Sequence, residues 1–390
     1  MGRKLLPEEA EGRLEGGIPD GSLRGSLRSH LRERDPGSEY SFMVDECWAG
    51  RWLGPTTVVV GEGGFRLATD ADPAPEAHLS GTVFPGFRDA HVHLGLVDGT
   101  ALVAGGIAAV DDFGWSLDLV RDWPHAEGLP SVAFAGQLLT ATGGYPTASG
   151  WAPPAAALEI DGPDDAPAAV DRQLEAGASF IKVALNSDAG PVLDDDTLAA
   201  IVSYAHDRGV TVAAHTQGAG QAARAFEAGV DVLAHAPWSE RLDDELLGAM
   251  ARATPGAMAD SMAWVSTLDI HGWGRYDGDF VVASDNVRRF HAAGGDIRYG
   301  TDLGNGPLPV GINPRELLAL EHAGLDLDAL AAAIAPAVDD GDLGRRLSYI
   351  PEREALTGEG SADDSTDHGP AAWLATGRLI DSATLKEHLA

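Results

Sequence analysis

The chain has 390 residues, which at about 150 residues per domain is enough for two or three domains, or for one large barrel with an appendage. Its 27 Lys+Arg against 60 Asp+Glu leave a formal net charge of −33. The electric field of this negative charge repels phosphate backbones and anionic lipid headgroups, which excludes nucleic-acid binding and electrostatic binding to membranes. The single cysteine, Cys47, excludes a disulfide framework and a cysteine-rich zinc site, and it favours a reducing, cytoplasmic compartment. We also expect no secretory signal and no membrane helix, because the N-terminus is charged and prolines interrupt the longest charge-free window, residues 128–160.

The two ends of the chain differ from its middle in composition and in hydrophobic pattern. Residues 1–41 are rich in charge and glycine and lack a hydrophobic period, which predicts a charged N-terminal extension. Short β-like runs follow within 42–82, and a further apolar run lies within 368–390, after an acidic, glycine-rich linker at 358–369. We therefore predict one small, abridged β-sandwich built from both termini.

The middle of the chain, residues 83–367, alternates between strand-like and helix-like patterns. Helical patterns at 194–209, 218–229 and 312–324 end in glycine or continue into it, as a left-handed helix cap requires. Eight short apolar runs bounded by turns are predicted strands, at residues 83–93, 107–114, 131–140, 179–186, 210–216, 230–237, 256–263 and 296–304.

Eight strands that alternate with helices or crossovers predict an α/β fold, a (β/α)₈ TIM barrel, and near-continuous apolar strands suit a parallel sheet buried on both faces. A doubly wound sheet would need a glycine-rich turn that opens the first helix. The segment GEGG at 61–64 has neither the spacing nor the following helix.

Four histidines and one aspartate stand at the ends of predicted strands. His91 and His93 are two residues apart on one strand, so both side chains face the same side. Alone, such a pair is equally typical of two solvated histidines. His215, His235 and Asp302 end the fifth, sixth and eighth strands, at the edge where barrel enzymes hold their sites. Imidazole and carboxylate ligands of this kind suit Zn²⁺ or a similar divalent ion.

Lys182 is unusual because it lies inside the apolar run FIKVALN, and the chain holds only two other lysines, Lys4 and Lys386. Burying an unpaired ammonium is costly. A snorkelling or ion-paired lysine is one explanation. The other is that CO₂ has converted the amine to a carbamate anion able to bridge two metal ions.

Taken together, these segments resemble the amidohydrolase superfamily, most closely the binuclear branch of prolidase-like and imidazolonepropionase-like enzymes. The resemblance runs from about residue 81 to residue 324, over half the chain. The segments that carry it are PGFRDAHVHLG, GIAAVDDFG, AGQLLTATGGY, GASFIKVALN, VTVAAHTQGAGQAARAFEAGVDVLAHAP and YGTDLGNGPLP.

The resemblance implies a role for each candidate ligand. His91 and His93 would bind a buried metal ion, His215 and His235 a more exposed one, and Lys182 as carbamate would bridge them. Asp302 would be both a metal ligand and the catalytic proton shuttle. The implied enzyme holds two divalent ions, with Zn²⁺ as the expected metal, and hydrolyses an amide, lactam, ester or lactone bond.

Two departures from the family pattern bear on this interpretation. The usual C-terminal motif G-x-I-x-x-G-x-x-A-D-L is absent, which implies an abridged β domain. The mononuclear deaminase branch carries a Glu shortly after the fifth-strand His, whereas this chain reads His215-Thr-Gln-Gly. A mononuclear deaminase of a heterocyclic amine and a non-catalytic protein on the same fold remain the alternatives.

Aromatic residues, Trp151 among them, follow several predicted strand ends, which predicts a pocket for a neutral, apolar or ring-containing small molecule, or for one with at most one carboxylate. We assign Tyr145, Trp238 and Trp264 to substrate binding, and Arg275 is the clearest candidate to meet an anionic group. The alternative is that these rings pack the loops onto the barrel. The expected partner is a small-molecule substrate, and the sequence leaves open whether the chain forms a homo-oligomer.

Overall fold

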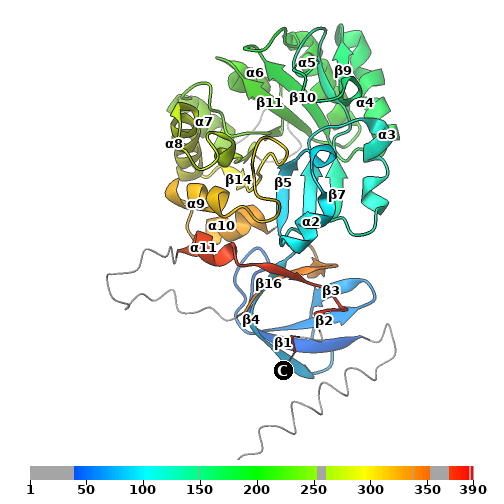
Figure 1. Cartoon of the computed structure of the whole chain (residues 1–390), viewed down its shortest axis with the longest axis vertical. Coiled ribbons are helices and arrows are strands. Elements are labelled where there is room, and N and C mark those ends of the chain that lie inside the picture. Colours follow the sequence, from blue (N-terminus) through cyan, green and yellow to red (C-terminus); the bar gives the residue numbers. More distant parts are fainter. Residues whose placement is uncertain are drawn as a thin grey trace, which may run out of the picture.

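The computed structural model describes residues 39–147, 149–252, 261–335, 337–351, 369–385 and 388–389. The predicted extension 1–41 therefore lies outside the described residues up to 38, and so does most of the predicted linker at 358–369. Figure 1 shows two regions along the long axis of the molecule: one with strands surrounded by helices, and one built around a separate sheet.

The separate sheet has seven strands in the order β15-β3-β2-β1-β4-β16-β17. Its own core includes Phe42 and Phe65, whose rings meet edge to face at 6.4 Å between centroids. Chain segments near both ends contribute to it, and so do two strands inside the range expected for the barrel. Its strands are β1 (Tyr40–Cys47), β2 (Thr56–Gly61), β3 (Gly64–Leu67), β4 (Ala77–Pro85), β15 (Asp342–Gly344), β16 (Leu347–Ile350) and β17 (Arg378–Ile380).

The helix-covered region is mixed α/β with parallel strands, as the sequence predicts. One sheet has three strands, in the order β5-β6-β7: β5 (Arg88–Val92), β6 (Ala109–Asp112) and β7 (Ser131–Phe134). The other has the order β14-β13-β12-β11-β10-β8-β9. Its strands are β8 (Leu138–Ala141), β9 (Ala157–Ile160), β10 (Ile181–Asn186), β11 (Val212–Gln217), β12 (Val232–Leu233), β13 (Ala263–Val265) and β14 (Asp296–Arg298).

The expected third strand, 131–140, is divided into β7 and β8 around Gly136. The backbone there has a positive φ of +80°, and a Cβ would lie 2.5 Å from Oε1 of Gln173. Only glycine fits both conditions. The expected seventh strand, 256–263, falls partly on residues 253–260, which are outside the described part of the chain.

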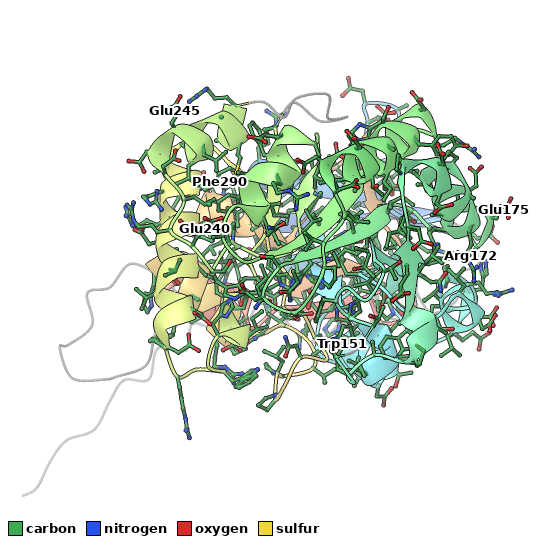
Figure 2. The ribbon with its side chains drawn as sticks, turned by 90° about the horizontal axis from the view of Figure 1, so that it is seen from above. Trp151, Arg172, Glu175, Glu240, Glu245 and Phe290 are labelled. Carbon is green, nitrogen blue, oxygen red and sulfur yellow. The ribbon has the colours of Figure 1, made fainter. Side chains whose placement is uncertain are left out.

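Helices lie outside these strands in Figure 1. Side chains of Asp194, Asp277 and Asp326 cap the N-termini of three of them by accepting backbone N–H bonds. On the outer surface, Glu175 and Glu245 point away from the molecule (Figure 2). The helices are α2 (Gly99–Ala104), α3 (Leu117–Val120), α4 (Ala166–Glu175), α5 (Asp195–Asp207), α6 (Gln221–Glu227), α7 (Asp244–Arg252), α8 (Gly278–Ala292), α9 (Pro314–His322), α10 (Leu327–Ile334) and α11 (Pro370–Leu374).

Backbone hydrogen bonds join the two parallel sheets at the position that holds the candidate ligands. The amides of Ala90 and His93 donate to the carbonyls of Tyr299 and Leu303, at 2.9 and 2.8 Å. These bonds bring β5 beside the segment that follows β14. Across the described residues, no helix has both the length and the apolar character needed to cross a membrane.

Candidate metal centre

Three of the predicted ligands form a compact buried group. His91 lies on β5 and His93 directly follows it, so their side chains share a face, as the spacing predicts. Asp302 follows β14, and its Oδ1 lies 3.3 Å from Nε2 of each histidine. Ligand atoms of these three residues all lie within 4.8 Å of one another, which is close enough to hold a metal ion.

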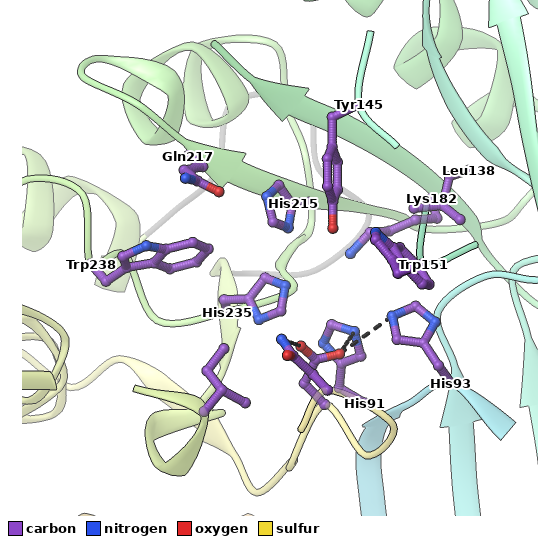
Figure 3. A pocket seen from close by; sticks show the side chains of 13 residues that line it. His91, His93, Leu138, Tyr145, Trp151, Lys182, His215, Gln217, His235 and Trp238 are labelled. Carbon is purple, nitrogen blue, oxygen red and sulfur yellow. Dashed lines mark hydrogen bonds and ion pairs between the residues drawn. The ribbon is translucent and has the colours of Figure 1, made fainter. Parts of the chain in front are cut away.

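The other three predicted ligands line the same cavity of about 130 Å³ (Figure 3). Lys182 comes from β10 and His215 from β11, while His235 follows β12. The ring of His235 lies 4.6 Å from that of His91 and 4.9 Å from that of His215, between centroids. The fold therefore brings all six candidates together.

Several buried atoms in this cavity lack a hydrogen-bond partner: Nε2 of His91, Nζ of Lys182 and Oδ1 of Asp302. Leaving such atoms unpaired is expensive in a folded protein. Nitrogen and carboxylate donors are also the ligands that zinc and similar ions prefer. The residues present thus fit a divalent metal site.

The far sides of the imidazoles are held in place. Nδ1 of His91 donates to the carbonyl of Ala234 at 2.7 Å, and Nδ1 of His93 donates to Gly114 at 3.2 Å. Nδ1 of His235 lies 3.0 Å from the hydroxyl of Thr267. Such bonds direct the opposite ring nitrogen toward a metal.

The surroundings in the cavity favour the neutral imidazole at His215 and His235 but not at His93. Burial lowers the pKa of His215 to about 3 and the pKa of His235 well below its usual value. Burial would also lower the pKa of His93, but the Asp302 carboxylate outweighs it and raises that pKa. In turn, the neighbouring histidines outweigh burial and hold the pKa of Asp302 well below its usual range.

Burial acts on Lys182 in the same sense and lowers its pKa to about 7, despite the opposing effect of Asp302. The amine is 1% exposed, and it lies 4.5 Å above the centre of the Phe113 ring. A lysine of this pKa is largely neutral at slightly alkaline pH, and a neutral amine is the form that can react with CO₂.

Of the three residues assigned to substrate binding, two line this cavity. Tyr145 stacks on His215, with 5.0 Å between centroids, and Trp238 meets the edges of His215 and His235. The assignment of Trp264 needs correction. Its ring lies on β13, is 0% exposed and stacks on Phe290 of α8 at 3.9 Å, so it packs the helix against the sheet.

The sequence analysis did not identify several further residues of this site. Asp89 is fully buried two residues before His91 and accepts bonds from the backbone N–H groups of His91 and Thr301. Asn305 donates to Oδ2 of Asp302 at 2.9 Å, a contact that its spacing of three residues after Asp302 could have suggested. Trp151, one of the aromatic residues expected near the pocket, also lines the cavity, and the remaining unpredicted residues of its wall are Leu138, Gln217 and Ile270.

Comparison with solved structures confirms the resemblance at the level of fold. A Xaa-Pro dipeptidase with methionine bound in its active site matches with a TM-score of 0.66 and 19% identity, over 90% of this chain and 100% of that one. A protein from Bifidobacterium longum assigned as a prolidase matches at 0.64 and 25%, over 82% and 90%. A prolidase complexed with N-methylphosphonate-L-proline matches at 0.62 and 19%, over 81% and 93%. The chain thus has the fold of amidohydrolase-superfamily enzymes.

Two other comparisons found nothing. No protein-family model and no curated protein sequence matches this chain. The relationship therefore rests on the fold.

Proposed function

We propose that this protein is a metal-dependent hydrolase that cleaves an amide, lactam, ester or lactone bond of a small, apolar or ring-containing substrate. The observation that carries the proposal is the convergence of His91, His93, Lys182, His215, His235 and Asp302 on one buried cavity. The fold supports it, because the structural matches include a dipeptidase and a prolidase, which cleave C–N bonds. Small-molecule turnover in the cytoplasm is part of the same proposal.

We further propose that the two parallel sheets form one (β/α)₈ barrel. Support comes from the bonds between β5 and residues 299–303, together with bonds at the opposite seam. There, the amide of Trp115 donates to Gly136 at 2.8 Å and that of Ser179 to Phe134 at 2.9 Å. A barrel would gather the carboxyl ends of the strands, and hence the six donors, at one mouth.

Two divalent ions, preferably Zn²⁺, are proposed for this centre. His91 and His93 would hold one and His215 and His235 the other, with Asp302 as a further ligand. Lys182 would attack CO₂, lose a proton and become a carbamate that supplies a shared anionic ligand. When bound, such cations polarise a carbonyl oxygen and make water a nucleophile at neutral pH.

The protein's own residues would perform the proton transfers. Oδ2 of Asp302 is held by Asn305, and its carboxylate stays ionised because its pKa is low. Asp302 would take the proton from the attacking water and pass it to the leaving nitrogen or oxygen. Tyr145 and Trp238 would hold the substrate beside it, and the walls of the buried cavity would exclude bulk water.

Metal analysis tests the proposal. Elemental analysis after metal-supplemented expression should give about two divalent ions per chain, and His91→Ala should lose both metal and thermal stability, because metal binding contributes to folding. The metal-loaded protein should then hydrolyse members of a mixed amide, ester and lactone library. One ion per chain together with ammonia release from heterocyclic amines would favour the deaminase, and absence of bound metal would refute the hydrolase.

A further inference from the structure

A second cavity opens from the metal centre and was not predicted from the sequence. It measures about 300 Å³, more than twice the inner one. The two cavities share His93, Tyr145, Trp151, Asp302 and Asn305, so they lie next to each other. We call the larger one the outer chamber; its remaining lining residues are Leu96, Gly304 and Gly306.

The segment that holds Gly304 and Gly306 packs tightly against two other segments and forms one wall of the outer chamber. Gly304 and Gly306 have positive φ values of +112° and +80°. A Cβ on Gly306 would lie 2.4 Å from the Trp273 ring, and one on Gly304 would lie 3.0 Å from Cδ1 of Leu96. The indole N–H of Trp273 also donates a hydrogen bond to the carbonyl of Asn305 at 3.0 Å, which holds the ring in place. The wall is therefore preformed and presents apolar groups together with backbone.

The outer chamber contains a carboxylate but no lysine or arginine side chain among its described lining residues. None of its lining residues in the described part of the chain is a lysine or an arginine, and the carboxylate of Asp302 lies at its junction with the inner cavity. Arg275, which the sequence suggested as the partner of an anionic group on the substrate, lines neither cavity and is exposed. A substrate carboxylate placed against Leu96, Gly304 and Gly306, away from the metal centre, would find no lysine or arginine side chain to pair with.

Resting on the hydrolase function proposed above, we propose that the outer chamber binds the uncharged, apolar half of the substrate. The protein then selects substrates whose carboxyl group is blocked, such as peptide amides, esters and lactones, over free dipeptides and free N-acyl amino acids. This selectivity separates the chain from the dipeptidases that share its fold. The aromatic walls of Tyr145 and Trp151 would supply the contact area.

A matched pair of substrates tests this selectivity. Leu-Phe and Leu-Phe-NH₂ have the same shape and differ in the charge of the terminal group. With metal-loaded protein at pH 7.5, kcat/KM for release of phenylalaninamide should exceed that for release of phenylalanine by at least about tenfold, the factor that one modest unpaired charge produces. Equal rates, or faster cleavage of Leu-Phe, would overturn the proposal.

A charge added to the chamber wall sharpens the test. Leu96→Arg would supply the missing cation and should shrink the preference for the amide by about tenfold. Leu96→Gln is the matched control, because it shortens the apolar contact without adding charge, and its preference should stay with the amide. An unchanged ratio in Leu96→Arg would count against the chamber as the carboxyl-side subsite.

Binding of the leaving-group halves provides a readout that needs no turnover. In isothermal titrations of the metal-loaded protein, phenylalaninamide should bind more tightly than phenylalanine, and Leu96→Arg should reduce the difference. If this pattern holds while nothing in the library is cleaved, the hydrolase fails and the chamber's selectivity stands. Cleavage with tighter binding of phenylalanine would instead support the hydrolase and refute the selectivity.

Discussion

At the residue scale, the orientation of each candidate ligand depends on a bond made on its far side. His91 and His93 donate from Nδ1 to backbone carbonyls, and this leaves both Nε2 atoms facing Oδ1 of Asp302. Asp302 itself occupies a left-handed backbone conformation, with φ of 54°, which is uncommon for any residue but glycine. Strain of this kind persists where surrounding contacts enforce it, and it is concentrated at functional sites.

Asp302→Asn tests the proposed base. The amide keeps an oxygen that can contact a metal, but it cannot accept the proton from water. We expect kcat to fall by at least about 10²-fold while the metal content stays near that of the wild type. The measurement is steady-state kinetics on the best library substrate, normalised to bound metal. If turnover per bound metal ion were unchanged, Asp302 would serve as a ligand alone.

Lys182 allows a rescue experiment. Lys182→Ala removes the group that would carry the carbamate and opens space in the cavity, so activity should be nearly lost and partly restored by formate or acetate. Lys182→Arg should not be rescued, because its guanidinium stays charged and would repel the cations. Metal content and activity should return together as acid is added to Lys182→Ala. Full activity in either variant without added acid would rule out the carbamate.

At the element scale, the short 3₁₀ helix Leu268–Ile270 fixes the residue behind His235. The N–H groups of Leu268 and Asp269 donate to the two oxygens of buried Glu316 on α9, at 2.9 and 2.7 Å. This holds Thr267 in a left-handed conformation, with φ of 44°, and its hydroxyl against Nδ1 of His235. Neither Thr267 nor Glu316 could be predicted, because the contact joins three segments that are far apart in sequence.

Thr267→Val and Thr267→Ser form a matched pair for this arrangement. Valine keeps the β-branched shape and the backbone strain but removes the hydroxyl, whereas serine keeps the hydroxyl. We expect Thr267→Val to weaken metal binding by about tenfold, the usual lower bound for losing such a supporting contact, and Thr267→Ser to bind nearly as the wild type does. Competition with a chromogenic chelator measures both. Equal affinities in the two variants would exclude a role for the hydroxyl.

The same contrast explains what the sequence could and could not predict. His91, His93 and Lys182 were predictable because strand alternation and strand ends determine where such side chains point. Trp264 was misplaced because the predicted strand ended at residue 263, whereas β13 continues to Val265, so Trp264 lies inside the strand and packs on Phe290. The outer chamber could not be predicted, since Leu96 and Gly304 meet through loop packing that leaves no periodic pattern in the sequence.

At the scale of the whole molecule, the net charge of −33 must act on stability. Ion pairs between arginine and aspartate, such as Arg289 with Asp285, offset part of the repulsion in the described structure. Exposed pairs contribute at most about 1 kcal/mol each, and they cannot compensate an excess of this size. Self-repulsion therefore destabilises the compact state, and it is the longer-ranged of the two effects.

Added salt should consequently stabilise this protein. The screening length shrinks from about 10 Å at 0.1 M to about 3 Å at 1 M salt, which suppresses distant repulsion while adjacent opposite charges still interact. We expect Tm to rise by about 5 °C between 0.1 and 1 M KCl, corresponding to a few kcal/mol.

A charge variant on the surface tests the same effect. Glu175→Lys, at the exposed C-terminal end of α4, should raise Tm at 0.1 M salt and have less effect at 1 M. It lowers the net negative charge by two and places a cation at a helix C-terminus. Glu175→Gln, which removes one charge, should have about half the effect. Scanning calorimetry of the three proteins at both salt concentrations makes the comparison, and a Tm that fell with KCl would show that the local ion pairs outweigh the global repulsion.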